Sequence, residues 1–345
     1  MLIGEYAVLN GSPALVLAVN RRARVSVQAC SRNASQIEVP QLGLEPVKFR
    51  LMSDMSIDWL DHRAEQPAFQ RARQTLEWQF ERGARRGAKV DGLQIHIDTS
   101  ELYQQTPEGE VKLGIGSSAA MTVALAGALE AIFDPAPVDV VRDRLWSVLL
   151  APYREGQGGL GSGIDIAASL FGGCQRFQLT QSGANVNSVR LPKGLEMVFV
   201  WAGASASTPD FLACFDRWRS HGAEQSRHLL QQMDKCCGAA LEFVQRDDAA
   251  GFMTCINNFR RFMGKIGEMM DAPVLSRPLE QIIAAAESAE VACKPCGAGG
   301  GDLALLAGTD VVELDAAVKD LERGGWPDLG LSEDGVGLQF ETGPA

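Results

Sequence analysis

The alternation of hydrophobic and polar positions predicts several strands in the N-terminal third of the chain. Residues 13–30 are rich in Val, Ala and Leu and end in an alternating pattern, which predicts two strands joined near Asn20 and Arg21. Residues 35–52 predict a second pair of strands, which two prolines interrupt. The stretch LQIHIDT, at residues 93–99, alternates cleanly and predicts a further strand.

A helical period occupies the segment between these strands. Residues 66–86 place Phe69, Ala72, Leu76 and Phe80 on one stripe, which predicts a helix with one buried face. The many arginines of this segment are interpreted as its solvated face.

Two more predicted helices follow glycine-rich stretches. The apolar run MTVALAGALEAIF extends to about Phe133, and IDIAASLF occupies residues 164–171. The polar stretch at residues 104–111, which contains a proline and a glycine, is predicted to be a loop.

The sequence changes character in its second half. Residues 194–203 (GLEMVFVWAG) predict a strand, and Thr208 before a proline predicts the start of a helix. Helical segments extend from there to about Met270 and again over residues 278–292. The change predicts a soft domain boundary near residues 184–194, and the chain length also favours two domains.

Composition and charge exclude several functional classes. The 345 residues are 46% hydrophobic and 22% charged, and the net charge of −11 offers no basic stripe to a nucleic acid. No apolar run is long enough to span a membrane, and the N-terminus lacks the basic segment of a signal peptide. We therefore expect a cytoplasmic protein with neither a nucleic-acid nor a membrane partner.

The eight cysteines are interpreted as reduced thiols. They include one C-x-x-C, from Cys293 to Cys296, and the adjacent pair Cys236 and Cys237, while the four histidines are scattered. A zinc site usually needs two such pairs, or one pair with histidines nearby, so no metal–thiolate site is expected.

The stretch KLGIGSSAA combines two glycines with a helix start. Gly114 and Gly116 allow the backbone to approach a ligand closely, and Ser117, Ser118 and Ala119 begin the helix that follows. Free N–H groups and the helix dipole at such a terminus favour a phosphate, and a serine hydroxyl there is a suitable Mg²⁺ ligand. The spacing matches neither the Walker pattern nor G-x-G-x-x-G. A tight turn with serine caps is the alternative.

A second glycine-rich stretch, EGQGGLGSGIDIAASLFGG at residues 155–173, supplies carboxylates. Asp165 lies three residues after Ser162 at the start of a helix, where it could serve the acceptor in a phosphoryl transfer or merely cap the helix. Glu155 could provide a second carboxylate for a metal ion.

The third glycine cluster spans residues 297–302, with four glycines in its first five positions. Either a flexible hinge or a close approach to a phosphorylated ligand would explain it. Together, the three loops favour a site that handles phosphate groups.

Three motifs in this order resemble those of the GHMP kinases. They are GEYAVLNGSPALVLAV (4–19), KLGIGSSAA (112–120), with Ile115 where leucine is usual, and KPCGAGGGD (294–302). The resemblance implies an α+β, two-domain fold that binds ATP between the domains. It implies a domain like the second domain of ribosomal protein S5 over residues 1–188 and a ferredoxin-like domain over residues 189–345.

Within that superfamily, the chain is most similar to the phosphomevalonate kinase branch. The leading lysine of the central motif and the W-x-G-x-x-A-S-T pattern of residues 201–208 carry this similarity. It implies transfer of the γ-phosphoryl group of ATP, with Mg²⁺, to 5-phosphomevalonate. A mevalonate kinase or another alcohol-phosphorylating member, a diphosphomevalonate decarboxylase, and a ligand-binding regulator remain alternatives, and a homodimer stays open.

The resemblance also implies roles for individual residues. Asp165 would be the catalytic aspartate, while Ser118 and, with a looser spacing, Glu155 would ligate Mg²⁺. The remaining implied contacts are Gly114, Ile115, Gly116, Ser117, Ser118 and Ala119 for the ATP phosphates, and Lys112, Ser162, Gly163, Ser207, Thr208, Gly297, Ala298, Gly299 and Gly300 for the phosphorylated acceptor.

One departure from the family concerns its first motif, which usually begins P-G-K. The lysine would lie five positions before Gly4, which is upstream of Met1. We expect that Met1 is an internal methionine and that the natural product starts earlier.

Overall fold

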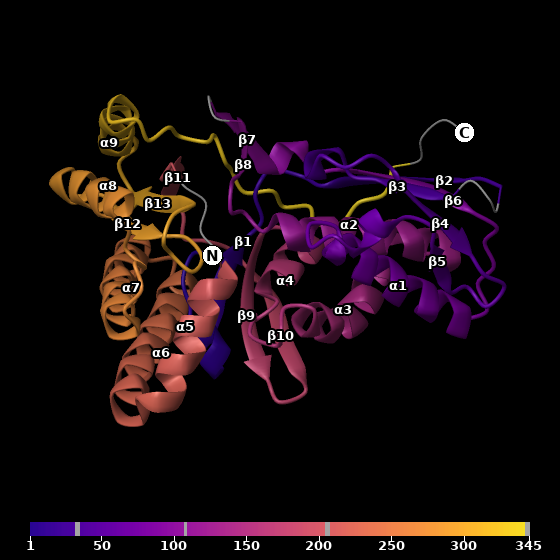
Figure 1. Cartoon of the computed structure of the whole chain (residues 1–345). Helices are drawn as coiled ribbons and strands as arrows, with labels where there is room; N and C mark the ends of the chain where they lie inside the picture. Colours follow the sequence, from indigo (N-terminus) through magenta and orange to yellow (C-terminus); the bar gives the residue numbers. More distant parts are fainter. Residues whose placement is uncertain (32–34, 107–108, 204–207, 342–345) are drawn as a thin grey trace.

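The computed structural model describes residues 1–31, 35–106, 109–203 and 208–341. It has an α+β architecture in which helices pack on sheets that are mainly antiparallel (Figure 1). The predicted fold class is confirmed. Within these ranges, no single helix is long and apolar enough to span a membrane, and α2 with α3, both given below, meets the length and composition test only as a pair bent by 116°.

The largest sheet lies in the N-terminal half, with strand order β2-β6-β3-β4-β5 and a parallel pairing between β3 and β6. Alternate residues of β6 point into a core that α1 and α2 cover. The predicted stripe of Phe69, Ala72, Leu76 and Phe80 is buried in that core. The elements are β2 (Arg24–Ala29), β3 (Gln36–Glu38), β4 (Val47–Leu51), β5 (Ile57–Trp59), α1 (Gln70–Arg85), β6 (Leu93–Asp98) and α2 (Ser117–Phe133).

A second sheet, in the order β1-β9-β10, packs against α4, and α3 packs against α2 and α4. The pattern analysis did not predict α3, whose charged residues and internal Pro152 hide its apolar stripe. It did not predict the β9–β10 pair either. The elements are β1 (Ala14–Leu17), α3 (Val138–Glu155), α4 (Ile164–Phe171), β9 (Cys174–Thr180) and β10 (Gly183–Val189).

A third sheet, β11-β13-β12, forms the centre of the C-terminal part. Every residue of β13 is buried, because Leu305 and its alternate neighbours face α5, α6 and α7 while Leu306 faces α8 and α9. The elements are β11 (Glu196–Trp201), α5 (Thr208–His221), α6 (Ala223–Gln245), α7 (Ala249–Met270), α8 (Arg277–Ser288), β12 (Ala292–Pro295), β13 (Leu303–Gly308) and α9 (Val311–Arg323).

Two local predictions were wrong. The stretch predicted as a polar loop carries a hairpin, β7 (Tyr103–Thr106) with β8 (Gly109–Lys112), whose strands lack the apolar alternation that identifies a strand. The helix predicted to reach residue 292 ends at Ser288, because Glu290 adopts a φ of 57° and turns the chain into β12.

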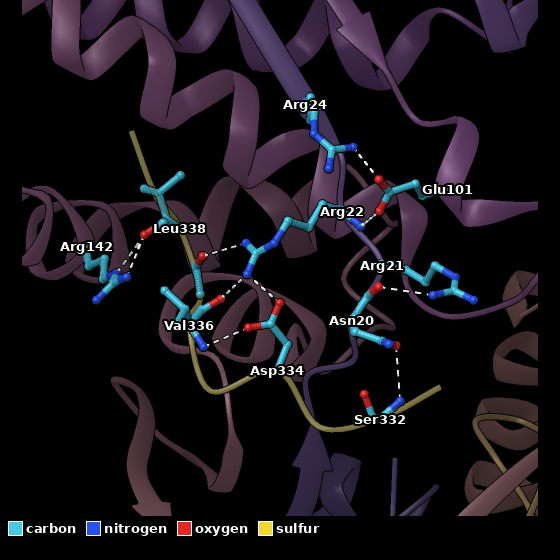
Figure 2. Close-up of polar contacts among 11 residues, drawn as sticks. Asn20, Arg21, Arg22, Arg24, Glu101, Arg142, Ser332, Asp334, Val336 and Leu338 are labelled. Atoms are coloured by element: carbon cyan, nitrogen blue, oxygen red, sulfur yellow. Dashed lines mark hydrogen bonds and ion pairs between the residues drawn. The ribbon is translucent and has the colours of Figure 1, made fainter. Parts of the chain in front are cut away.

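The last described segment returns to the N-terminal half. Residues 332–341, here called the C-terminal strap, begin at a bridge between Glu333 and Val19 and pass beside α2 and α4 (Figure 1). Arg22 donates to the carbonyls of Val336 and Gly337 and forms an ion pair with Asp334, as Figure 2 shows for the labelled residues. The strap therefore ties the two parts of the molecule together. The predicted boundary between residues 188 and 189 stays a prediction.

Candidate active site

One cavity of about 1900 Å³ receives residues from all three glycine-rich loops. Its lining includes Gly116 of the first loop, Asp165 at the second, and Gly297 of the third. The first loop joins β8 to α2, the second joins α3 to α4, and the third joins β12 to β13, so packed elements hold both ends of each loop. Loops separated by more than 180 residues thus meet at one surface.

The first loop presents an uncapped helix terminus to the cavity. Gly114 and Gly116 have φ values of 71° and 85°, in the left-handed region that favours glycine. A Cβ atom at Gly114 would collide with the carboxylate of Asp302, so no side chain fits there. Gly116 is the N-cap of α2 and no side chain caps this terminus, which leaves the N–H groups of Ser117 and Ser118 for a ligand. This cradle fits a phosphate.

The helix also buries one residue of the predicted phosphate loop. Ile115, Ser117 and Ser118 line the cavity, whereas Ala119 is fully buried in the core beneath it. Ala119 therefore supports the loop rather than facing a ligand.

Asp165 lies on the first turn of α4, close to the first loop. A Cβ atom at Gly116 would be 3.6 Å from its Cβ. The phenol of Tyr153 donates a hydrogen bond of 2.7 Å to Oδ2, and Oδ1 accepts from the N–H of Ile166 at 3.2 Å. Burial raises the pKa of Asp165 above its usual range, while the Tyr153 hydrogen bond and the more distant Arg71 act in the opposite direction.

Tyr153 and Arg71 are site residues that the pattern analysis missed. Burial and the charge of Asp165 hold the pKa of Tyr153 well above that of an ordinary phenol, so it remains a donor. The guanidinium of Arg71 lies over the Tyr153 ring, 4.9 Å from its centroid. Tyr153 belongs to the helix that was not predicted, and Arg71 stands among arginines assigned to a solvated face. No local signal distinguishes either residue.

The oxygen donors available for a metal ion differ from those predicted. Glu155 is exposed and does not line the cavity, while the Ser118 hydroxyl and the Asp165 carboxylate do. In the part of the chain that the structure describes, no group of three or more His, Cys, Asp or Glu side chains could hold a metal ion. Mg²⁺ commonly uses one or two protein oxygens together with phosphates and water, so Ser118 and Asp165 fit Mg²⁺ only when ATP is present.

The residues predicted to face the acceptor divide into two groups. Lys112 and Thr208 line the cavity, and so do Ser162, Gly163, Gly297 and Ala298. Gly299 and Gly300 instead pack against Val274, whose carbonyl accepts from the N–H of Gly300 at 2.8 Å. Ser207 lies outside the described residues.

The first motif contributes two further residues that the pattern analysis did not single out. Glu5 lines the cavity and pairs with Lys294, with 2.5 Å between Oε1 and Nζ. Both side chains are buried, at 2% and 0% exposure. The hydroxyl of Tyr6 donates to the carbonyl of Ala298 at 2.5 Å. These contacts connect the start of the chain to the third glycine loop.

Comparisons with curated proteins agree with this architecture. Residues 71–173 match the family model described as GHMP kinases N terminal domain. The chain is 27% identical to the phosphomevalonate kinase of Streptomyces sp. (strain CL190), covering 88% of this chain and 86% of that protein. It is 25% identical to the mevalonate kinase of Thermococcus gammatolerans, covering 87% and 84%.

Solved structures share the fold over nearly the whole chain. A protein of Listeria innocua (Lin0012) superposes with a TM-score of 0.84 at 20% identity, covering 96% of this chain and 95% of that one. The Streptococcus pneumoniae phosphomevalonate kinase in complex with phosphomevalonate and AMPPNP gives a TM-score of 0.76 at 16% identity, covering 96% and 97%. Residues 71–173 therefore match the GHMP kinase N-terminal domain, and the similarity to curated kinases over most of the chain supports an ATP-dependent phosphotransferase.

Proposed function

We propose that the protein transfers the γ-phosphoryl group of ATP to the phosphate of 5-phosphomevalonate, giving 5-diphosphomevalonate and ADP. The observation that carries this proposal is the convergence of the uncapped α2 terminus, Asp165 and Lys112 on one cavity. The similarity to a curated phosphomevalonate kinase over most of both chains supports the choice of acceptor.

In the proposed mechanism, the ATP phosphates rest on the glycine cradle and the N–H groups that begin α2. Mg²⁺, bound with Ser118 and Asp165, would neutralise charge on the β- and γ-phosphates. Asp165 orients the attacking phosphate oxygen of the acceptor. Because that oxygen is already mostly deprotonated at neutral pH, Asp165 positions it rather than removing a proton. The Tyr153 hydrogen bond holds the carboxylate in place.

The acceptor would lie on the opposite side of the cavity. Lys112 provides a cation for its phosphate, and Thr208 at the start of α5 provides a hydroxyl. Gly163 and Gly297 let the backbone approach the acceptor.

The proposal includes domains over residues 1–188 and 189–345 with ATP between them, and a cytoplasmic location. A homodimer stays a prediction.

A mevalonate kinase is the second candidate, because curated mevalonate kinases also match most of the chain. Such an enzyme phosphorylates a neutral hydroxyl, for which Asp165 would have to act as a base. A decarboxylase would release CO₂, and a regulator would bind nucleotide without turnover.

The test is ADP release from Mg-ATP with 5-phosphomevalonate, mevalonate, galactose and homoserine, measured in parallel with the masses of the products. Chelation of Mg²⁺ is the control and should abolish turnover. Turnover with 5-phosphomevalonate alone supports the proposal. Turnover only with another acceptor rejects the proposed substrate, and nucleotide binding without any turnover favours the regulator.

A further inference from the structure

The arginines of α1 differ in where they point. Arg85 pairs with Glu81, and Arg82 pairs with Glu130 at 3.1 Å, so these guanidinium groups are neutralised outside the cavity. Arg73 likewise pairs with Glu77 at 2.9 Å. Arg71, in the first turn of the same helix, instead lines the cavity. The helix α1, whose arginines were interpreted as its solvated face, therefore directs one cation toward the cavity.

Several other cations line the cavity, but most are already engaged. Arg22 is bound to Asp334 and Arg24 to Glu101, while Arg21 donates to the carbonyl of Leu329. Among the described arginine and lysine side chains of the lining, Arg71 and Lys112 contact neither a carboxylate nor the segment from Leu329 to the end of the C-terminal strap. In a chain with a net charge of −11, these two are the main sources of positive charge for a phosphate here.

The guanidinium of Arg71 is held in a fixed position. One terminal nitrogen donates to the carbonyl of Gly156 at 3.1 Å, and its plane lies over the Tyr153 ring. A Cβ atom at position 156 would lie 2.6 Å from the other terminal nitrogen, so only glycine permits this approach. Of the five N–H donors of an arginine, one is used in these contacts, and the others remain for a ligand.

The guanidinium of Arg71 lies close to Asp165, where negative charge builds up on the phosphoryl group during its transfer. Arg71 lies over the face of the Tyr153 ring, and the hydroxyl of the same tyrosine donates to Asp165, so the cation and the carboxylate contact one side chain. An arginine fork binds two phosphate oxygens at once and stabilises the charge on the transferred group.

We propose that Arg71 is a further catalytic residue, which binds the γ-phosphate of ATP and stabilises it during transfer. This inference rests on the proposed function for its catalytic part, whereas its binding part needs only a nucleoside triphosphate. Arg71 supplies this charge from α1, outside all three glycine loops.

The experiment compares Arg71→Ala, Arg71→Lys and the control Arg85→Met, whose side chain is 72% exposed and paired on the surface. Calorimetry measures the affinity of each for ATP and for ADP, and thermal unfolding checks the fold. We expect Arg71→Ala to weaken ATP binding about 10- to 100-fold while ADP binding changes little, because only ATP carries the γ-phosphate. Arg85→Met should leave both affinities unchanged.

Turnover and chemical rescue test the catalytic part. We expect Arg71→Ala to lower kcat about 10²- to 10³-fold with the best acceptor, and added guanidinium ion to restore part of the loss. Arg71→Lys keeps the positive charge but lacks the forked guanidinium, so its kcat should lie between those of the wild type and Arg71→Ala. Equal loss of ATP and ADP affinity, or no rescue by guanidinium in a folded Arg71→Ala, would overturn the inference. If the wild type turns over no acceptor, the proposed function fails, and the ATP-over-ADP selectivity still decides the role of Arg71.

Discussion

Two carboxylates line the same cavity in different surroundings. Glu5 is paired with the ammonium of Lys294, which also donates to the carbonyl of Pro295 at 2.6 Å. Asp165 has a neutral phenol as its nearest side-chain partner, and its cation, Arg71, lies beyond that phenol. One charge is compensated by direct contact, and the other is only partly compensated. The first arrangement joins two segments of the fold, while the second keeps a carboxylate ready for a ligand.

The partial compensation of Asp165 has a cost in stability. Because burial raises its folded-state pKa above the unfolded value, the folded state holds this proton more tightly. The contribution of protonated Asp165 to the stability of the fold is therefore fully present below the pKa of the unfolded state. It is lost as the pH rises through the raised pKa of the folded state. At neutral pH the charged form destabilises the protein, and removal of the charge should relieve this.

The largest expected effect comes from Asp165→Asn. This variant should lose about 10²- to 10⁴-fold in kcat while its ATP affinity changes little. Its melting temperature should rise relative to the wild type, more at pH 8 than at pH 4. Calorimetric binding and unfolding scans at several pH values measure these changes. Asp139→Asn is the control, since that side chain is 83% exposed. A variant with normal turnover would remove Asp165 from the mechanism.

The opposite result is expected for Lys294→Met. Loss of the ammonium leaves Glu5 buried without its counter-charge, and its Oε2 already has no hydrogen-bond partner among the described residues. The free energy of unfolding should fall by about 3–5 kcal/mol. Urea unfolding measures it, with Lys193→Met as a control at 92% exposure. If the loss is below about 1 kcal/mol, the contrast between the two carboxylates does not hold.

A smaller effect is expected from Tyr153→Phe. Without the phenolic donor, the carboxylate of Asp165 loses the hydrogen bond that favours its charged form, so its pKa should rise further. The acid side of the pH profile of kcat/KM should shift to higher pH, and kcat should fall about tenfold. Tyr103→Phe is the control, as Tyr103 does not line the cavity. An unshifted profile would show that Tyr153 only fills space.

The smallest effect is expected at a third, more exposed carboxylate. Asp334 of the C-terminal strap pairs with Arg22, and the two side chains are 17% and 32% exposed (Figure 2). Arg22→Met should lower the free energy of unfolding by about 1 kcal/mol and speed amide exchange in the strap. Arg323→Met, a surface pair at 78% exposure, serves as control. A loss as large as that of Lys294→Met would place the strap among the main determinants of stability.

The sequence predicted those features that short segments encode. The glycine loops and the helices after them were visible, because φ requirements and apolar runs are local properties. The structure places α2 at Ser117–Phe133 and α4 at Ile164–Phe171, as predicted.

The missed features depend on the tertiary fold. Glu5 and Lys294 are 289 positions apart, and neither has neighbours that indicate burial. The guanidinium of Arg71 donates to the carbonyl of Gly156, which lies at the end of a helix that the pattern did not reveal. Glu155 was predicted from a loose match to the family's metal-binding glutamate, and at the end of α3, where successive side chains point about 100° apart, it is exposed.

The C-terminal strap has a consequence for synthesis of the protein. Ser332 and Asn20 exchange hydrogen bonds of 3.0 Å, and the N–H of Asp334 donates to the carbonyl of Ala18. The ribosome therefore makes the N-terminal partner of these contacts more than 300 residues before the other. Strap residues such as Leu338 also form part of the cavity wall. A nascent chain that has emerged only as far as β13 still lacks this wall, so we expect ligand binding to begin only after the C-terminal strap has been made.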